Sequence, residues 1–337
     1  MVFWQPLPTP SAMNEFDRIR RFLAPLAAKA EGAFGLEDDA AEVIPPAGYR
    51  FVITQDTLVE TVHFLGSEPP AAIAQKALRV NISDLVAKGA QPWGYFLSIS
   101  LPARCGDDWL EQFASGLAQD QQNYGITLMG GDSTAHPSHA GITITALGTV
   151  ENGQSVLRRK GATEGDCIYV TGTIGDALAG LLILQGKLQA SGEAGDALVR
   201  RYTHPEPRLD FMPVLKRYAT ASMDVSDGLL QDLGHLLRLS GVGAVVQLEN
   251  IPLSDAVKGL QHEVTPDTIT TFSAGGDDYE LLFTVPSHHY DRLMQAANDA
   301  GIRLSAIGKI TADKGVRLEY NGRIVASPAK LGYLHAC

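Results

Sequence analysis

The sequence predicts a two-domain protein of the α/β (α+β) class. The chain has 337 residues, and a single domain usually takes about 100–200. Apolar residues recur at both strand and helix spacing in each half of the chain. A turn sequence, Glu151-Asn152-Gly153-Gln154, lies between the halves. We therefore expect an N-terminal domain over residues 1–152 and a C-terminal domain over residues 153–337.

Hydrophobic spacing predicts the elements of the first half. Residues 14–30 have apolar side chains at helical intervals after Asn14, a candidate N-cap. Residues 51–53 are predicted to form a buried strand that runs into Asp56. The remaining expected elements are a helix at 71–90, a strand at 95–101, a helix at 108–123, and strands at 126–129 and 141–150.

The second half is also mixed. A strand at 167–171 enters a glycine-containing loop and a helix at 174–188, which a polar loop at 189–197 follows. Further predicted elements are a helix at 229–239, strands at 243–248 and 281–285, a helix at 288–300 and a strand at 304–310. This order lacks the regular strand–helix alternation of a doubly wound sheet.

The composition excludes several classes of protein. A formal net charge of −11 argues against a nucleic-acid groove, which needs a basic face. No apolar run approaches the roughly 18 residues of a membrane span, and the N-terminus lacks the pattern of a secretory signal. No CxxC pair occurs, so we expect no disulfide framework or zinc site, and a cytoplasmic location. The three cysteines are Cys105, Cys167 and Cys337.

Several aspartates share one kind of neighbourhood: they lie beside glycine, serine, threonine or a strand end. Glycine lets the backbone approach a ligand closely, and carboxylate oxygens are the preferred protein ligands of Mg²⁺. Several such loops would together form a Mg²⁺–phosphate site. A single loop of this kind is more often a turn or a helix cap. The stretch Asp224–Gly228 is a stronger candidate, because it places two carboxylates and a hydroxyl at a strand-to-helix junction, although Asp227 could also cap the helix that follows. The aspartates are Asp38, Asp39, Asp56, Asp84, Asp132, Asp224, Asp227, Asp277 and Asp278.

Other motifs carry less information. No GxxxxGK[ST] sequence is present, which excludes a P-loop. The stretch Thr171-Gly172-Thr173-Ile174-Gly175 weakly resembles a dinucleotide-binding turn, but no acid ends a second strand about 20 residues later. His63 lies among apolar residues, as core histidines do. No histidine partner is predictable for Ser226, so we propose no nucleophilic triad and no general base.

Taken together, the motifs resemble those of the thiamine-monophosphate kinase family, in the aminoimidazole-ribonucleotide synthetase-like superfamily. The resemblance runs from about residue 14 to the C-terminus, and its motifs keep their number, order and spacing. The matching pieces are residues 35–41, Asp56–Glu60 with His63-Phe64, residues 81–85 with Gly89-Ala90, Gly130–Ser133, Arg159–Gly161, Thr171–Asp176, Asp224–Gly228, Gly275–Leu282 and Gly332-Tyr333.

The resemblance implies a fold and an activity. The family transfers the γ-phosphoryl group of ATP to thiamine monophosphate, with several Mg²⁺ ions. It implies a two-domain PurM-like fold, in which the mixed N-terminal sheet binds metal and nucleotide and forms a barrel across a homodimer. The C-terminal domain is then an α/β sandwich. ATP and thiamine monophosphate are the implied partners, with no nucleic acid and no membrane.

The resemblance also assigns roles to individual residues. Implied metal ligands are Asp39, Thr54, Gln55, Asp56, Asp84, Asp132, Asp224 and Asp227. Implied ATP contacts are Gly131, Asp132, Arg159 and Ser226, and implied thiamine monophosphate contacts are His63, Asp277 and Tyr333.

The sequence departs from the family in three places. Thr54-Gln55 stands where Ser-Thr is common, Asp277 replaces a glutamate, and the first acidic loop has Gly-Leu-Glu instead of Gly-Ile-Gly before its aspartates. Two alternatives therefore stay open. One is a sister ATP-dependent enzyme, either of the cyclo-ligase type or a selenophosphate synthetase. A selenophosphate synthetase needs a reactive cysteine or selenocysteine near the N-terminus, and the first cysteine here is Cys105, outside every motif. The other is a Mg²⁺–nucleotide-binding module without activity.

Overall fold

The structure is a computed structural model that describes residues 13–260, 263–328 and 331–333. The chain divides into two compact units, and the boundary crosses β1, α2, β2 and β4, which contribute residues to both. Unit 1 comprises Met1–Pro45, Gln55–Leu78 and Trp93–Ala146, and unit 2 comprises Pro46–Thr54, Arg79–Pro92 and Leu147–Cys337. The domain boundary that we expect after residue 152 stays a prediction.

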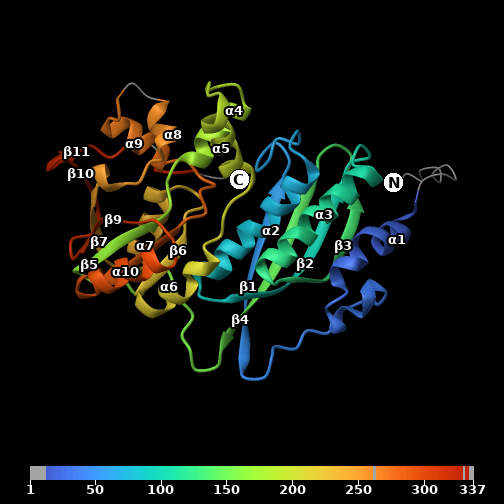
Figure 1. Cartoon of the computed structure of the whole chain (residues 1–337). Coiled ribbons are helices and arrows are strands. Elements are labelled where there is room, and N and C mark those ends of the chain that lie inside the picture. The colour runs from blue at the N-terminus through green and yellow to red at the C-terminus, as the bar shows by residue number, and fades with distance from the viewer. Residues whose placement is uncertain (1–12, 261–262, 329–330, 334–337) are drawn as a thin grey trace, which may run out of the picture. The chain divides into compact units, whose positions relative to one another are not determined.

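The N-terminal half forms a four-stranded sheet in the order β1-β4-β2-β3, with β2 and β3 parallel. Helices α2 (Pro70–Ala87) and α3 (Asp107–Tyr124) lie side by side over one face of this sheet (Figure 1). Ile142 and Ile144 of β4 are fully buried, while the alternate residues Thr143 and Thr145 bond side chains of β1. The strands are β1 (Tyr49–Val59), β2 (Gln91–Leu101), β3 (Thr127–Ala135) and β4 (Gly141–Glu151).

The segment before this sheet is helical, as predicted, but it is not one α-helix. Asn14 caps α1 (Glu15–Arg18), since its side chain accepts a 2.9 Å bond from the amide of Asp17. A π-helical turn η1 (Ile19–Leu23) and two 3₁₀ turns, η2 (Ala24–Ala27) and η3 (Glu31–Leu36), follow. Pro25 lacks the amide hydrogen that a continuous helix needs.

The C-terminal half forms a mixed seven-stranded sheet in the order β11-β10-β7-β9-β5-β8-β6. Among the pairings described for this sheet, only that of β7 with β10 is parallel, which agrees with the predicted absence of regular strand–helix alternation. The strands are β5 (Asp166–Thr171), β6 (Ala221–Asp224), β7 (Gly243–Gln247), β8 (Leu281–Pro286), β9 (Leu304–Thr311), β10 (Gly315–Tyr320) and β11 (Arg323–Val325). The helices are α4 (Asp176–Leu184), α5 (Gly192–Thr203), η4 (Leu209–Phe211), α6 (Met212–Tyr218), α7 (Leu229–Ser240), η5 (Leu248–Asn250), α8 (Asp255–Gly259), α9 (Pro266–Ser273), η6 (Ser287–His289) and α10 (Tyr290–Asp299).

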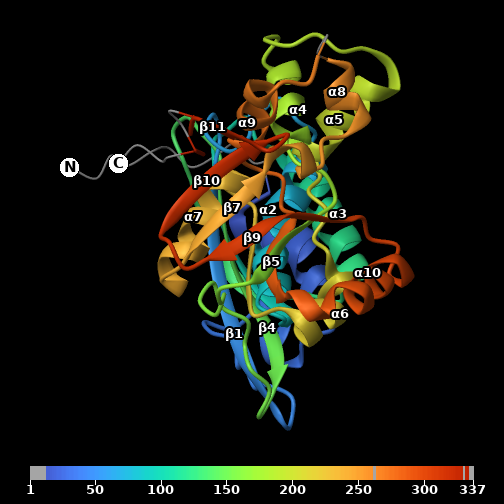
Figure 2. The ribbon, with the colours of Figure 1, turned by 90° about the vertical axis from the view of Figure 1, so that its left-hand side faces the viewer.

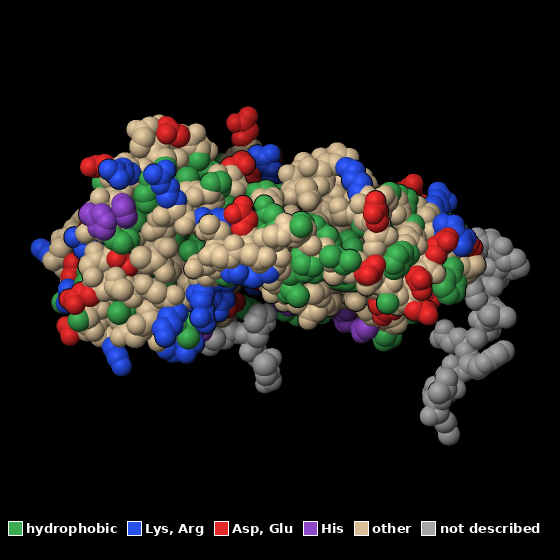
Figure 3. Space-filling view, turned by 90° about the horizontal axis from the view of Figure 1, so that it is seen from below, with side chains coloured by type: hydrophobic (Ala, Val, Ile, Leu, Met, Phe, Trp, Pro, Cys, Tyr) green, Lys and Arg blue, Asp and Glu red, His purple; other side chains and the backbone are tan. Residues whose placement is uncertain are grey.

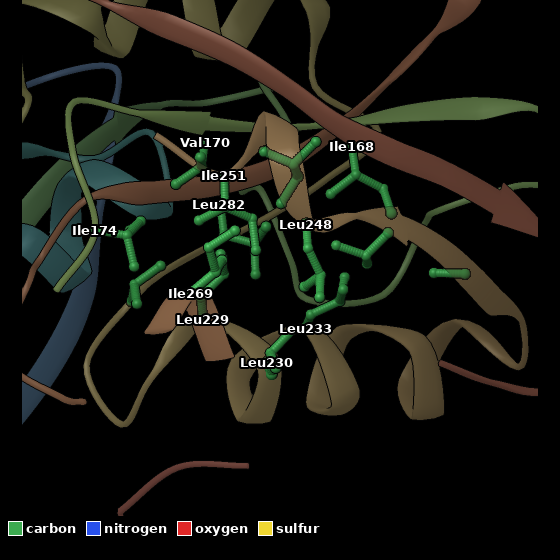
Figure 4. Packing of buried hydrophobic residues seen from close by; sticks show 14 of the residues in the cluster. Ile168, Val170, Ile174, Leu229, Leu230, Leu233, Leu248, Ile251, Ile269 and Leu282 are labelled. Carbon is green, nitrogen blue, oxygen red and sulfur yellow. The ribbon is translucent and has the colours of Figure 1, made fainter. Parts of the chain in front are cut away.

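Side-chain alternation along β5 explains why this sheet has helices on both faces. Ile168 and Val170 point into the apolar layer that Leu233 and its neighbours on α7 complete (Figure 4). Tyr169, between them, stacks on Phe283 with ring centroids 5.7 Å apart. Figure 2 shows α7 on one side of the sheet and α6 with α10 on the other. The predicted α/β sandwich is therefore confirmed.

Some predictions of local structure were wrong. Ile53 is 63% exposed, because β1 is an edge strand and this residue lies on the sheet face away from α2 and α3. Helix α5 begins at Gly192, inside the segment predicted as a loop. Strand β3 continues to Ala135 and so includes the Gly130-Gly131-Asp132 motif. Sequence patterns gave no range for α6, β6, α8, α9, β10 and β11, although Asp224 was expected at a strand-to-helix junction.

The surface mixes charges of both signs. On the face shown in Figure 3, Lys and Arg side chains and Asp and Glu side chains both occur in many places, and Lys and Arg side chains are densest in one patch. Among the helices of the described residues, none combines the length and apolarity that crossing a bilayer requires.

Candidate functional site

Two predicted metal ligands, Asp84 and Asp224, lie in one polar cluster of unit 2. Asp84 is on α2, and one of its oxygens accepts a 2.5 Å hydrogen bond from the hydroxyl of Thr54. Asp224 is the last residue of β6, and it accepts a 2.7 Å bond from the hydroxyl of Ser83. In the Asn-Ile-Ser-Asp motif, Ser83 thus binds the carboxylate of Asp224, and the next residue, Asp84, supplies a second carboxylate.

The electrostatics of this cluster are unfavourable without a cation. Asp224 is 3% exposed, and burial together with the neighbouring charge of Asp84 raises its pKa to about 8. The hydrogen bond from Ser83 and the charge of Lys88 act in the opposite direction. Burial likewise lowers the pKa of Lys88, whose ammonium group donates a 3.3 Å bond to the carbonyl of Ser222. A divalent cation bound here would stabilise the ionised form of this buried carboxylate and offset the repulsion from Asp84.

The loop after β6 presents Ser226 and Asp227, and Asp232 anchors it. One oxygen of Asp232, in the first turn of α7, accepts the amides of Ser226 at 3.0 Å and of Asp227 at 3.1 Å. Burial raises the pKa of Asp232 to about 7, although these bonds oppose the shift. Asp227 makes no capping bond to α7, whose N-cap residue is Gly228. The capping alternative for Asp227 is therefore wrong, and its carboxylate projects from a fixed backbone.

The segment that carries Asp277 packs directly on this loop. The amide of Asp277 donates to the carbonyl of Ser226 at 2.9 Å, and the amide of Tyr333 donates to that of Asp227 at 2.7 Å. The hydroxyl of Tyr279 bonds the carboxylate of Asp277 at 3.2 Å. Four predicted contact residues, namely Ser226, Asp227, Asp277 and Tyr333, thus belong to one hydrogen-bonded assembly in unit 2.

The Thr171–Gly175 stretch has a structural explanation that does not involve a dinucleotide. A Cβ atom at Gly172 would lie 2.0 Å from a carboxylate oxygen of Glu280. The amide of Gly175, which precedes α4, donates to both oxygens of Asp278 at 3.1 and 2.9 Å. The helix start that would receive a pyrophosphate therefore already binds the chain's own carboxylate.

Three of the acids singled out in unit 1, namely Asp38, Asp39 and Asp132, line a pocket, and Asp56 is not among its lining residues. A cavity of about 360 Å³ is lined by Asp39, Gly131 and Asp132, and by apolar residues that include Leu23 and Phe96. Gly131 pairs with Leu97 of β2, and a Cβ atom there would lie 1.8 Å from the carbonyl oxygen of Leu97. Glycine is therefore required for β3 to place Asp132 at the pocket.

Strand β1 divides its three candidate ligands between two faces. Successive side chains of a strand point to opposite sides, so Thr54 and Asp56 share one face and Gln55 occupies the other. The Gln55 amide donates a 2.6 Å bond to the hydroxyl of Thr145. The structure thus places the side chain of Gln55 apart from those of Thr54 and Asp56, at the position where the sequence departs from its family.

The last two predicted contacts are half-buried. The ring of His63 accepts a 3.0 Å bond from the amide of Val59, and its carbonyl accepts one from Lys76. The positive charge of Arg159 lies close enough to Lys88 and Asp232 to act on both groups. It lowers the pKa of each.

No group of three or more His, Cys, Asp or Glu side chains that could hold a metal is present among residues 13–260, 263–328 and 331–333. The donor set still has the chemistry that Mg²⁺ prefers, because Mg²⁺ usually takes one or two carboxylates and completes its shell with water and phosphate. Asp84 with Asp224 in unit 2, and Asp39 with Asp132 in unit 1, meet that requirement.

Sequence reasoning assigned no role to three residues of these clusters, namely Ser83, Lys88 and Asp232. Ser83 lies inside a quoted motif, so the motif itself was the available signal. Asp232 and Lys88 lie outside any recognisable pattern, and only the folded chain brings them to the site.

Replacing Asp224 by Asn is expected to stabilise the metal-free protein. The raised pKa means that the folded chain binds this proton more tightly than the unfolded chain, so the free energy of unfolding falls as pH rises from 3.8 to about 8. Asn carries no charge and still accepts the Ser83 bond. We expect a gain of at least about 1.4 kcal/mol at pH 8, the equivalent of one pKa unit.

Urea unfolding in EDTA measures this gain, with the exposed Asp313→Asn as the matched control. The gain should shrink as pH falls toward 5, while the control should differ little from the wild type. A stabilisation that does not change with pH would contradict this account.

Comparisons with known proteins agree with this arrangement. Residues 37–150 match the family model described as AIR synthase related protein, N-terminal domain, and residues 163–321 match the model of its C-terminal domain. The thiamine-monophosphate kinase of Caulobacter vibrioides is 40% identical over 97% of this chain and 92% of that protein.

Solved structures show the same likeness. The thiamine-monophosphate kinase from Stenotrophomonas maltophilia K279a has a TM-score of 0.78 and 38% identity, over 86% of this chain and 91% of its own. AaThiL, solved in complex with AMPPCP and TMP, has a TM-score of 0.75 and 31% identity, over 91% of this chain and 98% of its own. The predicted two-domain PurM-like fold is confirmed, and the chain belongs to the thiamine-monophosphate kinase family, within the AIR synthase related proteins.

Proposed function

We propose that this protein transfers the γ-phosphoryl group of ATP to thiamine monophosphate and so produces thiamine diphosphate and ADP. The observation that carries the proposal is the pair Asp84 and Asp224, whose crowded charge calls for a divalent cation. Membership of the family and the likeness to AaThiL, solved with AMPPCP and TMP, supply the identity of the two substrates.

The chemistry needs positioning more than proton transfer. The acceptor phosphate has a second pKa of about 6, so near neutral pH it is mostly a dianion that needs no general base. The obstacle is repulsion between two anions. Mg²⁺, which Asp84 and Asp224 would help to hold, would neutralise phosphate charge and so reduce this repulsion. We propose direct in-line transfer, in which the enzyme forms no covalent phosphoryl intermediate.

The residues divide into three proposed roles. Arg159 adds a fixed positive charge for phosphate oxygens, and Gly131, Asp132 and Ser226 contact ATP. The proposed thiamine monophosphate contacts are His63, Asp277 and Tyr333. The proposed metal ligands are Asp39, Thr54, Asp56, Asp84, Asp132, Asp224 and Asp227. Gln55 is left out, because its side chain lies on the other face of β1 and bonds Thr145.

The direct test is formation of thiamine diphosphate by the purified full chain from ATP and thiamine monophosphate. We expect product only with Mg²⁺, and none when free thiamine replaces the monophosphate. ATP consumption with a formylglycinamidine substrate would instead support the sister cyclo-ligase activity. Tight binding of Mg²⁺·ATP without product would support the inactive module, and a ³²P-labelled protein formed as fast as turnover would contradict in-line transfer.

Replacement of Asp84 by Asn should reduce kcat by about 100-fold, a usual effect of removing one charge-stabilising group, while the protein stays folded. The reason is that Asn keeps the size and the Thr54 contact but removes the anionic Mg²⁺ ligand. Steady-state kinetics over a range of Mg²⁺ concentrations measure this, with Asp313→Asn as the control. A near-normal kcat at every Mg²⁺ concentration would show that Asp84 is not a metal ligand.

We further propose that the protein is a homodimer that pairs through the uncovered face of the four-stranded sheet, and that it acts in the cytoplasm. On that face Ile53 is 63% exposed, next to Gln55 and Thr57. Exposed apolar surface on a sheet favours association with another chain. Cys105 and Cys167 are free thiols, which suits a reducing compartment.

The dimer can be tested by replacing Ile53 with Asp, which should place a charge in the interface and shift the protein toward monomer. Sedimentation velocity at micromolar concentration measures the shift. The matched control is Ile324→Asp on β11, where the wild-type side chain is 75% exposed. Equal behaviour of the two variants would exclude this face as the interface.

A further inference from the structure

Glu280 is a fully buried acid that lies outside the proposed ligand and substrate contacts. Its side chain is 0% exposed, and it accepts bonds from Arg208 Nε at 2.7 Å, from Arg208 Nη2, from Arg201 Nη2 at 2.7 Å and from the Thr171 hydroxyl at 2.7 Å. Burial acts to raise its pKa, but the bonds and charges of the two arginines outweigh burial and lower it. The carboxylate is therefore ionised inside the protein and held by two guanidinium groups.

The backbone of Glu280 continues directly into the segment that carries Asp277. The carbonyl of Glu280 accepts the amide of Val225 at 2.8 Å, and the amide of Tyr279 donates back to the carbonyl of Val225 at 2.8 Å. Asp277 and Tyr279 have φ angles of 69° and 50°, a left-handed conformation that non-glycine residues adopt rarely. Such a backbone persists only where its surroundings hold it.

The two arginines come from a separate part of the chain. Arg201 is in the last turn of α5, and Arg208 precedes η4. Their side chains are only 14% and 17% exposed, and Arg201 also bonds the backbone carbonyl of Asp278 at 3.3 Å. The bonds described for the two arginines reach Asp278 and Glu280, which follow Asp277 closely in the chain.

We infer that Glu280 is a positioning residue, and that its clamp by Arg201 and Arg208 fixes Asp277 in the conformation that binds the acceptor substrate. The inference rests on the proposed function, in which Asp277 contacts thiamine monophosphate. Arg208 binds through two nitrogens, a geometry that lysine cannot reproduce. The clamp thus adds a specificity element to the acceptor side of the site.

The neighbouring loop has an anchor of its own, which makes the inference testable. Asp232 holds the amides of Ser226 and Asp227, the proposed ATP and metal residues, without using Glu280. Loss of the Glu280 clamp should therefore affect the acceptor more than ATP. Loss of the Asp232 anchor should do the reverse.

The experiment compares Arg208→Met, Arg208→Lys and Asp232→Asn with the wild type, and uses the exposed Arg200→Met on the same helix as Arg201 as the control. We expect Arg208→Met to raise KM for thiamine monophosphate by about 10-fold or more, as loss of supporting groups around a site typically does. Its KM for ATP should change less. Arg208→Lys should recover part of the loss, Asp232→Asn should mainly raise KM for ATP, and Arg200→Met should match the wild type.

Hydrogen exchange gives a second readout that needs no activity. In Arg208→Met, peptides that cover residues 275–282 should exchange faster, while those that cover residues 229–240 should stay protected. Equal changes of both KM values, a fall in kcat alone, or unchanged exchange at 275–282 would each overturn the inference. If the wild type makes no thiamine diphosphate, the proposed function fails, and the exchange data still decide whether the clamp holds this segment.

Discussion

The buried carboxylate of Asp224 beside Asp84 is the constraint on which the rest of the site depends. A charged group inside a protein is costly unless other groups compensate it. Here Ser83 and Lys88 compensate it only in part, since its pKa is still raised to about 8. Two carboxylates therefore lie close together at the end of β6, with only partial compensation of their charge. Such an arrangement favours binding of a cation, which can in turn bind phosphate groups.

Other acids of the C-terminal half serve the backbone and not a ligand. Asp232 and Asp278 accept amides at the starts of α7 and α4, where many proteins bind phosphate. Because the chain's own carboxylates occupy these helix starts, phosphate recognition in the proposed reaction falls to metal ions and to Arg159. This division accounts for an ATP-using site without a P-loop.

Long elements with regular spacing could be predicted from the sequence, and short ones could not. The ends of helices α2, α3 and α7 were predicted to within three residues, because their apolar stripes repeat over at least three turns. Strand β6 has four residues, all buried, and so shows no alternation. Yet β6 places Asp224, which means that the element most important to the site had the weakest signal.

The sequence by itself determined the two-domain α/β class, the family and the set of acidic loops, because these depend on residue type, order and spacing. Tertiary structure alone decided which residues support those loops. Asp232 reaches the Ser226 loop, Lys88 acts on Asp224, and Arg208 binds Glu280 across 72 positions of sequence. It also turned Gln55 to the opposite face of β1 from Asp56. Burial and long-range pairing set these relationships, and both exist only once the chain has folded.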